Sequence, residues 1–343
     1  MKKQFSFPTI AFIAILFFAS CSKQFVGEGI SNSPVQNFET LWQDFDQHYG
    51  AFGPKGIEWK ALYTKYRPAI TESMSDKALL DTMAHMLDVL NDNHIYIRPM
   101  ANTGLPWYAG GILGRTVVED YNHTVAQTYL HETFTYNRAL HYGFFPGNIG
   151  YINLKSFDEN ISTYYKAMDV ILDKLKDTKG IVIELRENDG GEDRVAQYIA
   201  DRFATERHLS FSSSLRNGPR YTDFSEPILF YTQPEGSFQY TKPVILLTNL
   251  NTFSSGETFV LAMLQNKNVK MVGRTTGGAL SDAWERELPN GWMYRLPIAD
   301  VRDATGKNLE GIGIEPHVKI ENTKEELKAG HDKALEKALD LLK

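Results

Sequence analysis

Cysteine is almost absent from this sequence: Cys21 is the single cysteine among 343 residues. An intramolecular disulfide is therefore impossible, and a thiolate zinc cluster or a cysteine redox pair is excluded as well. The nine histidines form no His-Glu-x-x-His motif, and no second histidine lies at metal-ligand spacing from His94. We therefore expect no metal and no cofactor.

An excess of positive charge is also missing. Lysine and arginine total 36 against 42 aspartates and glutamates, for a net charge of −6. Because no basic stripe occurs, nucleic acid is not expected as a partner. Hydrophobic residues at 42% and charged residues at 23% are ordinary for a globular protein, which excludes long-range disorder. At ~150 residues per domain, the length allows two domains.

A long hydrophobic run is lacking too. Phe5–Phe18 is mostly apolar, but it is shorter than the ~20 residues that cross a membrane. With two lysines before it and small residues after it, this run predicts a secretory signal peptide over residues 1–20. The small residues before Cys21 resemble the lipobox of bacterial lipoproteins. That resemblance implies cleavage after Ser20, a lipid on Cys21, and a membrane anchor in the bacterial cell envelope that faces the periplasm or the cell surface. An ordinary signal peptide with a chance cysteine is the alternative.

Four regions with different composition and hydrophobic pattern follow this segment. Residues 21–35 are small and polar, which predicts a flexible tether. Over residues 36–94, apolar side chains recur at i, i+3, i+4 and i+7, which predicts a helical cap domain. Residues 95–147 mix short strand-like pieces with glycines and are expected to connect two domains. Over residues 148–343, apolar strands alternate with helices, which favours a layered α/β core with parallel strand pairing.

Two further elements are expected within the core. Two alternating runs flank Pro289-Asn290-Gly291, a pattern that predicts a β-hairpin. The charged, amphipathic stretch Lys324–Leu342 predicts one last helix on the outside of the core.

The first candidate for chemistry follows an apolar strand that ends at Thr248. A strand, a tight turn and a helix form the geometry that exposes a nucleophile, so Ser254 or Ser255 is a candidate. The amide of the next residue could then donate to a developing oxyanion. Ser254-x-x-Glu257 also fits a capping box, however, and a helix cap is the alternative interpretation.

Two other pieces supply groups that such a nucleophile needs. His94 follows the last helix of the predicted cap and could act as a general base, although a lone histidine is more often structural. Gly190-Gly191 follows a buried strand, where glycine amides can approach an oxyanion closely. The acidic residues 187–193 could instead hold a calcium ion, or they could simply form a tight turn.

Each piece is weak alone, but their order along the chain is specific. Over residues 38–318 the chain resembles the tail-specific, or C-terminal processing, serine peptidases, and among them the tricorn-core-like branch. In that family a glutamate stands three residues after the reactive serine, so Glu257 assigns the role to Ser254 rather than Ser255. The matching pieces, in chain order, are Asp92–His94, Leu185–Gly191, Asn251–Phe259, Gly273–Gly278 and Glu310–Pro316.

One departure indicates the mechanism that the resemblance implies. Processing proteases of the Ser–Lys type carry a lysine where this chain has Ala279, and no lysine occurs between Lys270 and Lys307. The resemblance therefore implies a serine peptidase with Ser254 as nucleophile and His94 as general base.

The remaining parts of the site are implied by the same branch. Glu310 and Asn93 would orient the catalytic pair, with Asn93 standing where the tricorn-like branch has serine. The amides of Ser255, Gly190 and Gly191 would form the oxyanion hole.

The resemblance also implies a fold and partners. The core would be of the ClpP/crotonase-like kind, and the substrate would be a peptide or an unfolded protein. About 55 residues separate His94 from the core, too few for a complete PDZ domain with its connections. Whether the chain forms a homo-oligomer stays open. A catalytically inactive, membrane-anchored lipoprotein that binds peptides or other ligands is the alternative function, and a calcium or carbohydrate binder built on residues 187–193 is a distant third.

Overall fold

A computed structural model describes residues 31–158 and 160–343. The predicted signal peptide, the lipidation site at Cys21 and most of the predicted tether lie outside the described residues. Within the described ranges, no helix is long and apolar enough to cross a membrane.

The described chain begins with a helical unit. Ser33 caps the first helix by accepting a hydrogen bond from the Gln36 amide, and Ser75 caps the last in the same way through Ala78. The apolar faces of these helices meet in one buried cluster, which confirms the predicted helical spacing. The elements of this unit are α2 (Pro34–His48), α3 (Phe52–Lys55), α4 (Trp59–Tyr66), η1 (Arg67–Ala69), α5 (Asp76–Leu87) and η2 (Asp88–Leu90).

A four-stranded antiparallel sheet packs against these helices, and half of it comes from the far end of the chain. Its order is β11 (Ala283–Glu287), β12 (Met293–Pro297), β1 (Tyr96–Arg98) and β2 (Tyr108–Ala109), with the short helix η3 (Ala101–Thr103) between the last two. The β11–β12 pair is the predicted hairpin, and Gly291 takes the positive φ of 84° that its turn requires. Trp292 and Tyr294 of this hairpin are buried in the same cluster as Phe45 and Trp59 of the helices.

The second unit is built on a seven-stranded sheet of order β14-β10-β9-β6-β5-β4-β3. The first five strands pair in parallel and the last two are antiparallel, so the predicted parallel pairing is confirmed. In chain order the strands are β3 (Glu132–Asn137), β4 (Leu140–Phe145), β5 (Ile149–Leu154), β6 (Ile181–Glu184), β9 (Val244–Thr248), β10 (Val269–Gly273) and β14 (Val318–Lys319).

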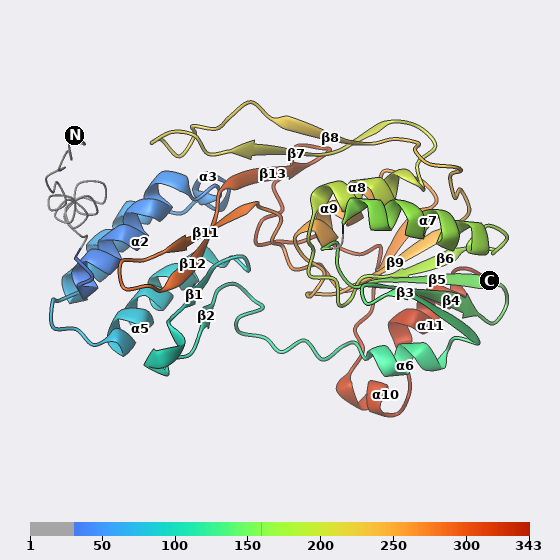
Figure 1. The fold of residues 1–343 in the computed structure, drawn as a ribbon, viewed down its shortest axis with the longest axis horizontal. Helices are drawn as coiled ribbons and strands as arrows, with labels where there is room; N and C mark the ends of the chain where they lie inside the picture. The colour runs from blue at the N-terminus through green and yellow to red at the C-terminus, as the bar shows by residue number, and fades with distance from the viewer. Residues whose placement is uncertain (1–30, 159) are drawn as a thin grey trace, which may run out of the picture.

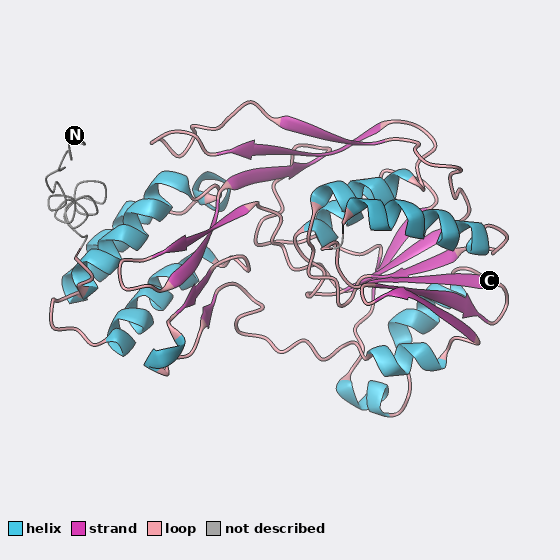
Figure 2. Cartoon of the chain, in the orientation of Figure 1, coloured by secondary structure: helices cyan, strands magenta, loops and turns pink. Residues whose placement is uncertain are grey.

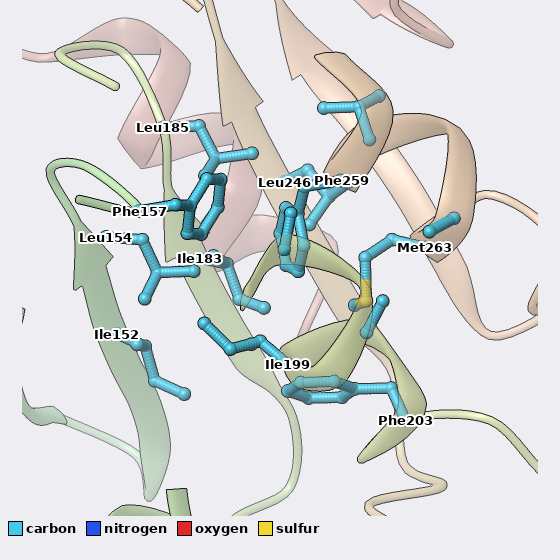
Figure 3. Packing of buried hydrophobic residues seen from close by; sticks show 14 of the residues in the cluster. Ile152, Leu154, Phe157, Ile183, Leu185, Ile199, Phe203, Leu246, Phe259 and Met263 are labelled. Carbon is cyan, nitrogen blue, oxygen red and sulfur yellow. The ribbon is translucent and has the colours of Figure 1, made fainter. Parts of the chain in front are cut away.

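Helices cover both faces of this sheet (Figure 1). One face meets α7 (Ile161–Leu175), α8 (Asp193–Asp201) and α9 (Ser255–Met263), and the other meets α6 (His123–Thr128) and α11 (Lys333–Asp340). Successive side chains of a strand point to opposite faces of the sheet. Because helices cover both faces, the strands are apolar on both sides. Ile183 and Leu246 join the first cluster, for example, while their neighbours Val182 and Ile245 join the second. Figure 3 shows Ile183 and Leu246 packed with Phe203 and Phe259 of the covering layer.

A third sheet links the two units and was not predicted. Its order is β13 (Ala299–Asp303), β7 (His208–Leu215) and β8 (Ile228–Thr232), all antiparallel. Figure 2 shows it along one side of the molecule, reaching from the helical unit to the core. Arg216, which follows β7, donates to the Tyr49 and Asp46 carbonyls at the end of α2.

The prediction of one last helix over Lys324–Leu342 was wrong. The structure has two helices there, α10 (Lys324–Lys328) and α11, because Gly330 adopts a left-handed φ of 87° that ends the first. The charged side chains of α11 face outward, while Ala334, Leu335 and Ala338 are buried against the sheet.

Candidate active site

Ser254 lies in a strained turn between β9 and α9. Its backbone has φ 58° and ψ −131°, a region that non-glycine residues rarely adopt and that costs roughly 1–3 kcal/mol. The turn is held because the Thr252 hydroxyl donates to the Leu185 carbonyl (2.7 Å) and the Ser254 amide donates to the Ala279 carbonyl (2.9 Å). The Ser254 side chain makes no capping hydrogen bond. The capping-box interpretation was therefore wrong, because the positive φ turns this hydroxyl away from the helix amides.

Glu257 has a different task from capping. Its buried carboxylate accepts hydrogen bonds from the Thr276 hydroxyl (2.5 Å) and from the Gly278 (2.9 Å) and Ala279 (2.7 Å) amides. Burial raises the pKa of Glu257 to about 7, although these donors favour its charged form. Because the Ala279 carbonyl in turn holds the Ser254 amide, Glu257 fixes the loop that supports Ser254.

Gly190, the first residue of the glycine pair after β6, lies directly against Ser254. A Cβ atom added to Gly190, whose φ is 97°, would come within 2.7 Å of the Ser254 Cβ. The Gly190 amide already donates to the Asn188 side chain at 2.9 Å. Gly191 forms a parallel β-bridge with Phe157, in which the Phe157 amide donates to the Gly190 carbonyl and the Glu192 amide donates to the Phe157 carbonyl. The N–H of Gly191 itself therefore takes no part in the bridge and has no acceptor among the described residues. The Ser255 N–H, at the first position of α9, has no acceptor in this part of the chain either.

His94 is buried beside the residue that precedes Ser254. Its side chain is 2% exposed, and its ring meets the Phe253 ring edge-on with 6.1 Å between centroids. Neither ring nitrogen has a hydrogen-bond partner among the described residues, so the Ser254 hydroxyl is not bonded to it here. Burial, reinforced by the charge of Arg295, lowers the pKa of His94 from 6.5 to about 4. The ring is therefore neutral at neutral pH, the form that can accept a proton.

A charged network holds the backbone of His94, and sequence reasoning missed two of its members. The His94 amide donates to Asp92 Oδ1 (3.0 Å), and the Tyr49 hydroxyl donates to Asp92 Oδ2 (2.8 Å). The Lys55 ammonium lies 3.4 Å from the same Oδ2 and donates to the Leu90 carbonyl (3.0 Å). Neither Tyr49 nor Lys55 stands in a motif, so only the folding of α2 and α3 against the Asp92 turn reveals them.

Glu310 reaches the same place from the far end of the chain. Its Oε2 accepts hydrogen bonds from the Leu280 (2.8 Å) and Ser281 (3.0 Å) amides, while its Oε1 is buried without a partner among the described residues. One ligand atom each of Asp92, His94 and Glu310 lies within 4.8 Å of the others. Burial and the neighbouring Asp92 raise the pKa of Glu310 well above its ordinary value.

Asn93 contacts neither His94 nor Ser254 through a hydrogen bond of its side chain. Its Nδ2 donates to the Gly277 carbonyl (2.5 Å), and its Oδ1 accepts from the Leu113 amide (2.9 Å). It thus joins the His94 turn to the glycine-rich 273–278 turn and to the chain that leaves β2. Five of the sequence candidates therefore converge: Ser254, Ser255, Gly190, Gly191 and His94. Glu310 has a carboxylate oxygen within 4.8 Å of a His94 ring nitrogen, and the Asn93 side chain is bonded to Gly277 instead.

Comparisons with known proteins agree with this arrangement. The model of peptidase family S41 matches residues 148–320, and the model of the tricorn protease C1 domain matches residues 31–88. The carboxy-terminal processing protease CtpA of Bacillus subtilis is 30% identical over 176 residues, which are 51% of this chain and 35% of that protein. A carboxy-terminal-processing protease of Bartonella bacilliformis is 27% identical over 192 residues, 55% of this chain and 42% of its own. The matched segment thus covers less than half the length of either relative.

Solved structures confirm the predicted α/β fold class. A crystal structure described as a candidate peptidase from Parabacteroides merdae superposes with a TM-score of 0.81 at 27% identity, covering 91% of this chain and 97% of that one. Mature CPAF has a TM-score of 0.69 at 11% identity, covering 90% and 96%, and shows the fold alone. With the family model spanning half of the sequence and the geometry around Ser254 on the matched segment, the chain belongs to peptidase family S41.

Proposed function

We propose that this chain hydrolyses peptide bonds through an acyl-enzyme, with Ser254 as nucleophile and His94 as general base. One observation carries the proposal: Ser254 is held at a positive φ, with its hydroxyl uncapped and the unengaged backbone amide of Ser255 next to it. Strain of this kind persists only where the surroundings enforce it, and it gathers at functional sites. Membership of a peptidase family adds support.

The first step is proton transfer from Ser254. A serine hydroxyl is a weak nucleophile at neutral pH and needs a base within about 2.6–3.2 Å. His94 is neutral and both of its ring nitrogens are unengaged, so it can take this proton as the Ser254 oxygen attacks the substrate carbonyl carbon. It then gives the proton to the leaving amine, and water repeats the cycle on the acyl-enzyme. Binding of substrate would bring the His94 ring to the hydroxyl, because catalytic hydrogen bonds often tighten only in the complex.

The Ser255 and Gly191 amides are the donors that suit the oxyanion. Both N–H groups lack acceptors within the described chain. Ser255 follows Ser254 directly, and its hydroxyl donates to the Gly191 carbonyl (2.8 Å), whereas the Gly190 N–H is engaged with Asn188. We therefore assign Gly190 the role of making space, since any Cβ there would collide with Ser254. Losing one oxyanion donor typically costs ~10²–10³ in rate.

Glu310 and Asn93 act as positioning residues in this proposal. A carboxylate oxygen of Glu310 and a ring nitrogen of His94 lie within 4.8 Å of each other, and Glu310 Oε1 has no other partner among the described residues. In this proposal Glu310 orients His94 and stabilises its protonated form during the reaction. Asn93 acts indirectly, because its side chain donates to the Gly277 carbonyl and so holds the His94 turn in place. The substrate would be a peptide or an unfolded protein strand, which enters between the helical unit and the core.

A fluorophosphonate probe tests the assignment of the nucleophile. We expect an adduct on Ser254, mapped by mass spectrometry, that disappears in Ser254→Ala and in His94→Ala. Ser255→Ala is the matched control and should keep labelling, because its backbone amide survives. An adduct on another serine, or full peptide hydrolysis by a folded Ser254→Ala variant, would overturn the proposal. Absence of any adduct on folded protein would favour the ligand-binding alternative.

We also propose that Cys21 carries a lipid that anchors the chain in the cell envelope. The support is the basic, apolar and small-residue order of residues 1–21. Cells grown with an alkyne fatty acid should yield a labelled protein that partitions with membranes. Cys21→Ala should lose both the label and the membrane association, and a labelled Cys21→Ala protein would contradict the anchor.

A further inference from the structure

The group around His94 has features that acid–base catalysis alone does not require. Asp92, His94 and Glu310 are all buried, and each places one ligand atom within 4.8 Å of the other two. Both His94 nitrogens and Glu310 Oε1 have no partner in the described part of the chain. Buried polar atoms without partners are rare in folded proteins and call for a specific reason. A cation bound among them would satisfy one His94 nitrogen and a carboxylate oxygen of Glu310.

The donor set suits Zn²⁺. One imidazole nitrogen and two carboxylate oxygens are ligands that zinc accepts, and a water in the fourth position would complete a tetrahedron. Bonds of ~2.0–2.2 Å place the ligand atoms of such a site about 3.4 Å apart. The ligand atoms, which lie within 4.8 Å of one another, therefore need to approach by up to about 1.4 Å when the ion binds.

The charge around the group also favours a cation. Asp92 and Glu310 bring two carboxylates, and Lys55 supplies one ammonium, 3.4 Å from Asp92 Oδ2. A divalent ion binds with both carboxylates ionised, and in that state the group carries one net negative charge that attracts the ion.

An access path and an outer shell are present as well. Glu310 lines a cavity of about 300 Å³ together with Lys55, Asn91 and Ile312, so this cavity reaches one of the three ligand residues. Tyr49 donates to Asp92, and the Leu280 and Ser281 amides donate to Glu310. Such partners of the ligands orient them and raise metal affinity.

We propose that Asp92, His94 and Glu310 form a Zn²⁺ site and that zinc bound there inhibits the peptidase. The inhibition rests on the proposed function, whereas the site itself does not. Zinc would occupy the His94 lone pair that must accept the Ser254 proton, so the bound enzyme would keep its fold and lose its base. Sequence spacing cannot reveal this site, because Glu310 stands more than 200 residues from the other two ligands.

Binding is tested on the Ser254→Ala protein, which has no hydrolytic activity in the proposed mechanism. Co²⁺ serves as the spectroscopic probe and should give the visible absorption of a low-coordinate site, which Zn²⁺ then displaces. Losing even an outer-shell partner costs metal affinity roughly 10–100-fold. We therefore expect about that loss in Tyr49→Phe and a loss of at least 100-fold in Glu310→Gln and His94→Gln. His123→Ala, which removes a half-buried histidine elsewhere, should bind as before. A His94→Gln or Glu310→Gln variant that binds Co²⁺ as tightly as the parent Ser254→Ala protein would overturn the site.

Location and inhibition are tested separately. Crystals soaked in Zn²⁺ should show anomalous density among the three side chains, and zinc found only elsewhere, or no density there, would refute the site. With the peptidase active, micromolar Zn²⁺ should reduce hydrolysis at least tenfold and a chelator should restore it. Zinc that binds the group without slowing hydrolysis would refute the inhibition. Zinc binding in a protein that never hydrolyses peptides would leave the site standing and reject the proposed function instead.

Discussion

At the scale of single residues, the backbone conformation of Ser254 predicts that glycine gives a more stable protein than alanine at this position. At φ 58° a glycine is relaxed, whereas alanine keeps the strain of a Cβ in this region. We expect Ser254→Gly to be more stable than Ser254→Ala by about 1 kcal/mol, measured by urea unfolding. The same pair at Ser255, inside α9, should reverse the order, with alanine better by roughly 0.5–1 kcal/mol. If glycine were the less stable residue at both positions, the strain at Ser254 would not be real.

The pKa of His94 leads to a second prediction at this scale. An unfolded histidine binds its proton near pH 6.5, whereas burial holds the folded His94 neutral down to about pH 4. Between these values the unfolded state binds more protons, so this residue's contribution to stability is complete above pH 6.5 and is lost as the pH falls. The loss amounts to roughly 3 kcal/mol at pH 4.

The measurement compares the wild type with His94→Gln across this range. The wild type should lose more of its free energy of unfolding than the variant as the pH falls from 7 to 4. Glu257 and Glu310 have raised pKa values and contribute with the opposite sign, but both proteins contain them. A difference between the two proteins that does not change with pH would show that His94 titrates normally.

At the scale of elements, Glu257 carries more of the site than its place in α9 suggests. Two carboxylate oxygens accept three donors from the 276–279 loop, and Glu257→Gln would turn an NH₂ group toward one of them. We expect a cost of about 2–4 kcal/mol, since a buried donor loses its acceptor. Fluorophosphonate labelling of Ser254 should slow as well, because the Ala279 carbonyl that holds its amide belongs to this loop. The exposed Glu325→Gln is the control and should change stability by less than about 0.5 kcal/mol. Unchanged stability in Glu257→Gln would contradict this role.

The elements that could be predicted from sequence are those with a strong local signal. Serine caps and apolar spacing mark α2 and α5, and Pro289-Asn290-Gly291 marks the β11–β12 hairpin. The third sheet was missed because β8 lies at an edge and exposes Ile228 and Leu229, so its pattern resembles neither a buried strand nor an alternating one. The same limit applies to the site. Ser-x-x-Glu fits two structures equally well, and only the loop that meets Glu257 from 20 residues away decides between them.

At the scale of the whole molecule, the four-stranded and the seven-stranded sheets each contain segments that are far apart in the chain. β3 and β4, from the region that we expect to connect two domains, extend the seven-stranded sheet, while β11 and β12 return from the core to pair with β1. Sequence patterns carry no information on such long-range pairing, because each strand looks the same whichever sheet it joins. The catalytic proposal depends on this exchange, since His94 comes from one unit and Ser254 from the other.

This exchange predicts that the two units unfold together. Trp292, Tyr294 and Leu296 are buried within the helical unit, so residues 31–121 alone would lack part of their own core. We expect calorimetry of the described chain to give one transition whose van't Hoff and calorimetric enthalpies agree. A fragment of residues 31–121 should show no fixed near-ultraviolet signal. Trp292→Ala should lower the free energy of unfolding of the whole chain by about 3–5 kcal/mol, because it leaves a cavity where a large side chain is buried. Two separate transitions would show instead that the units are independent, and His94 could then leave Ser254 without either unit unfolding.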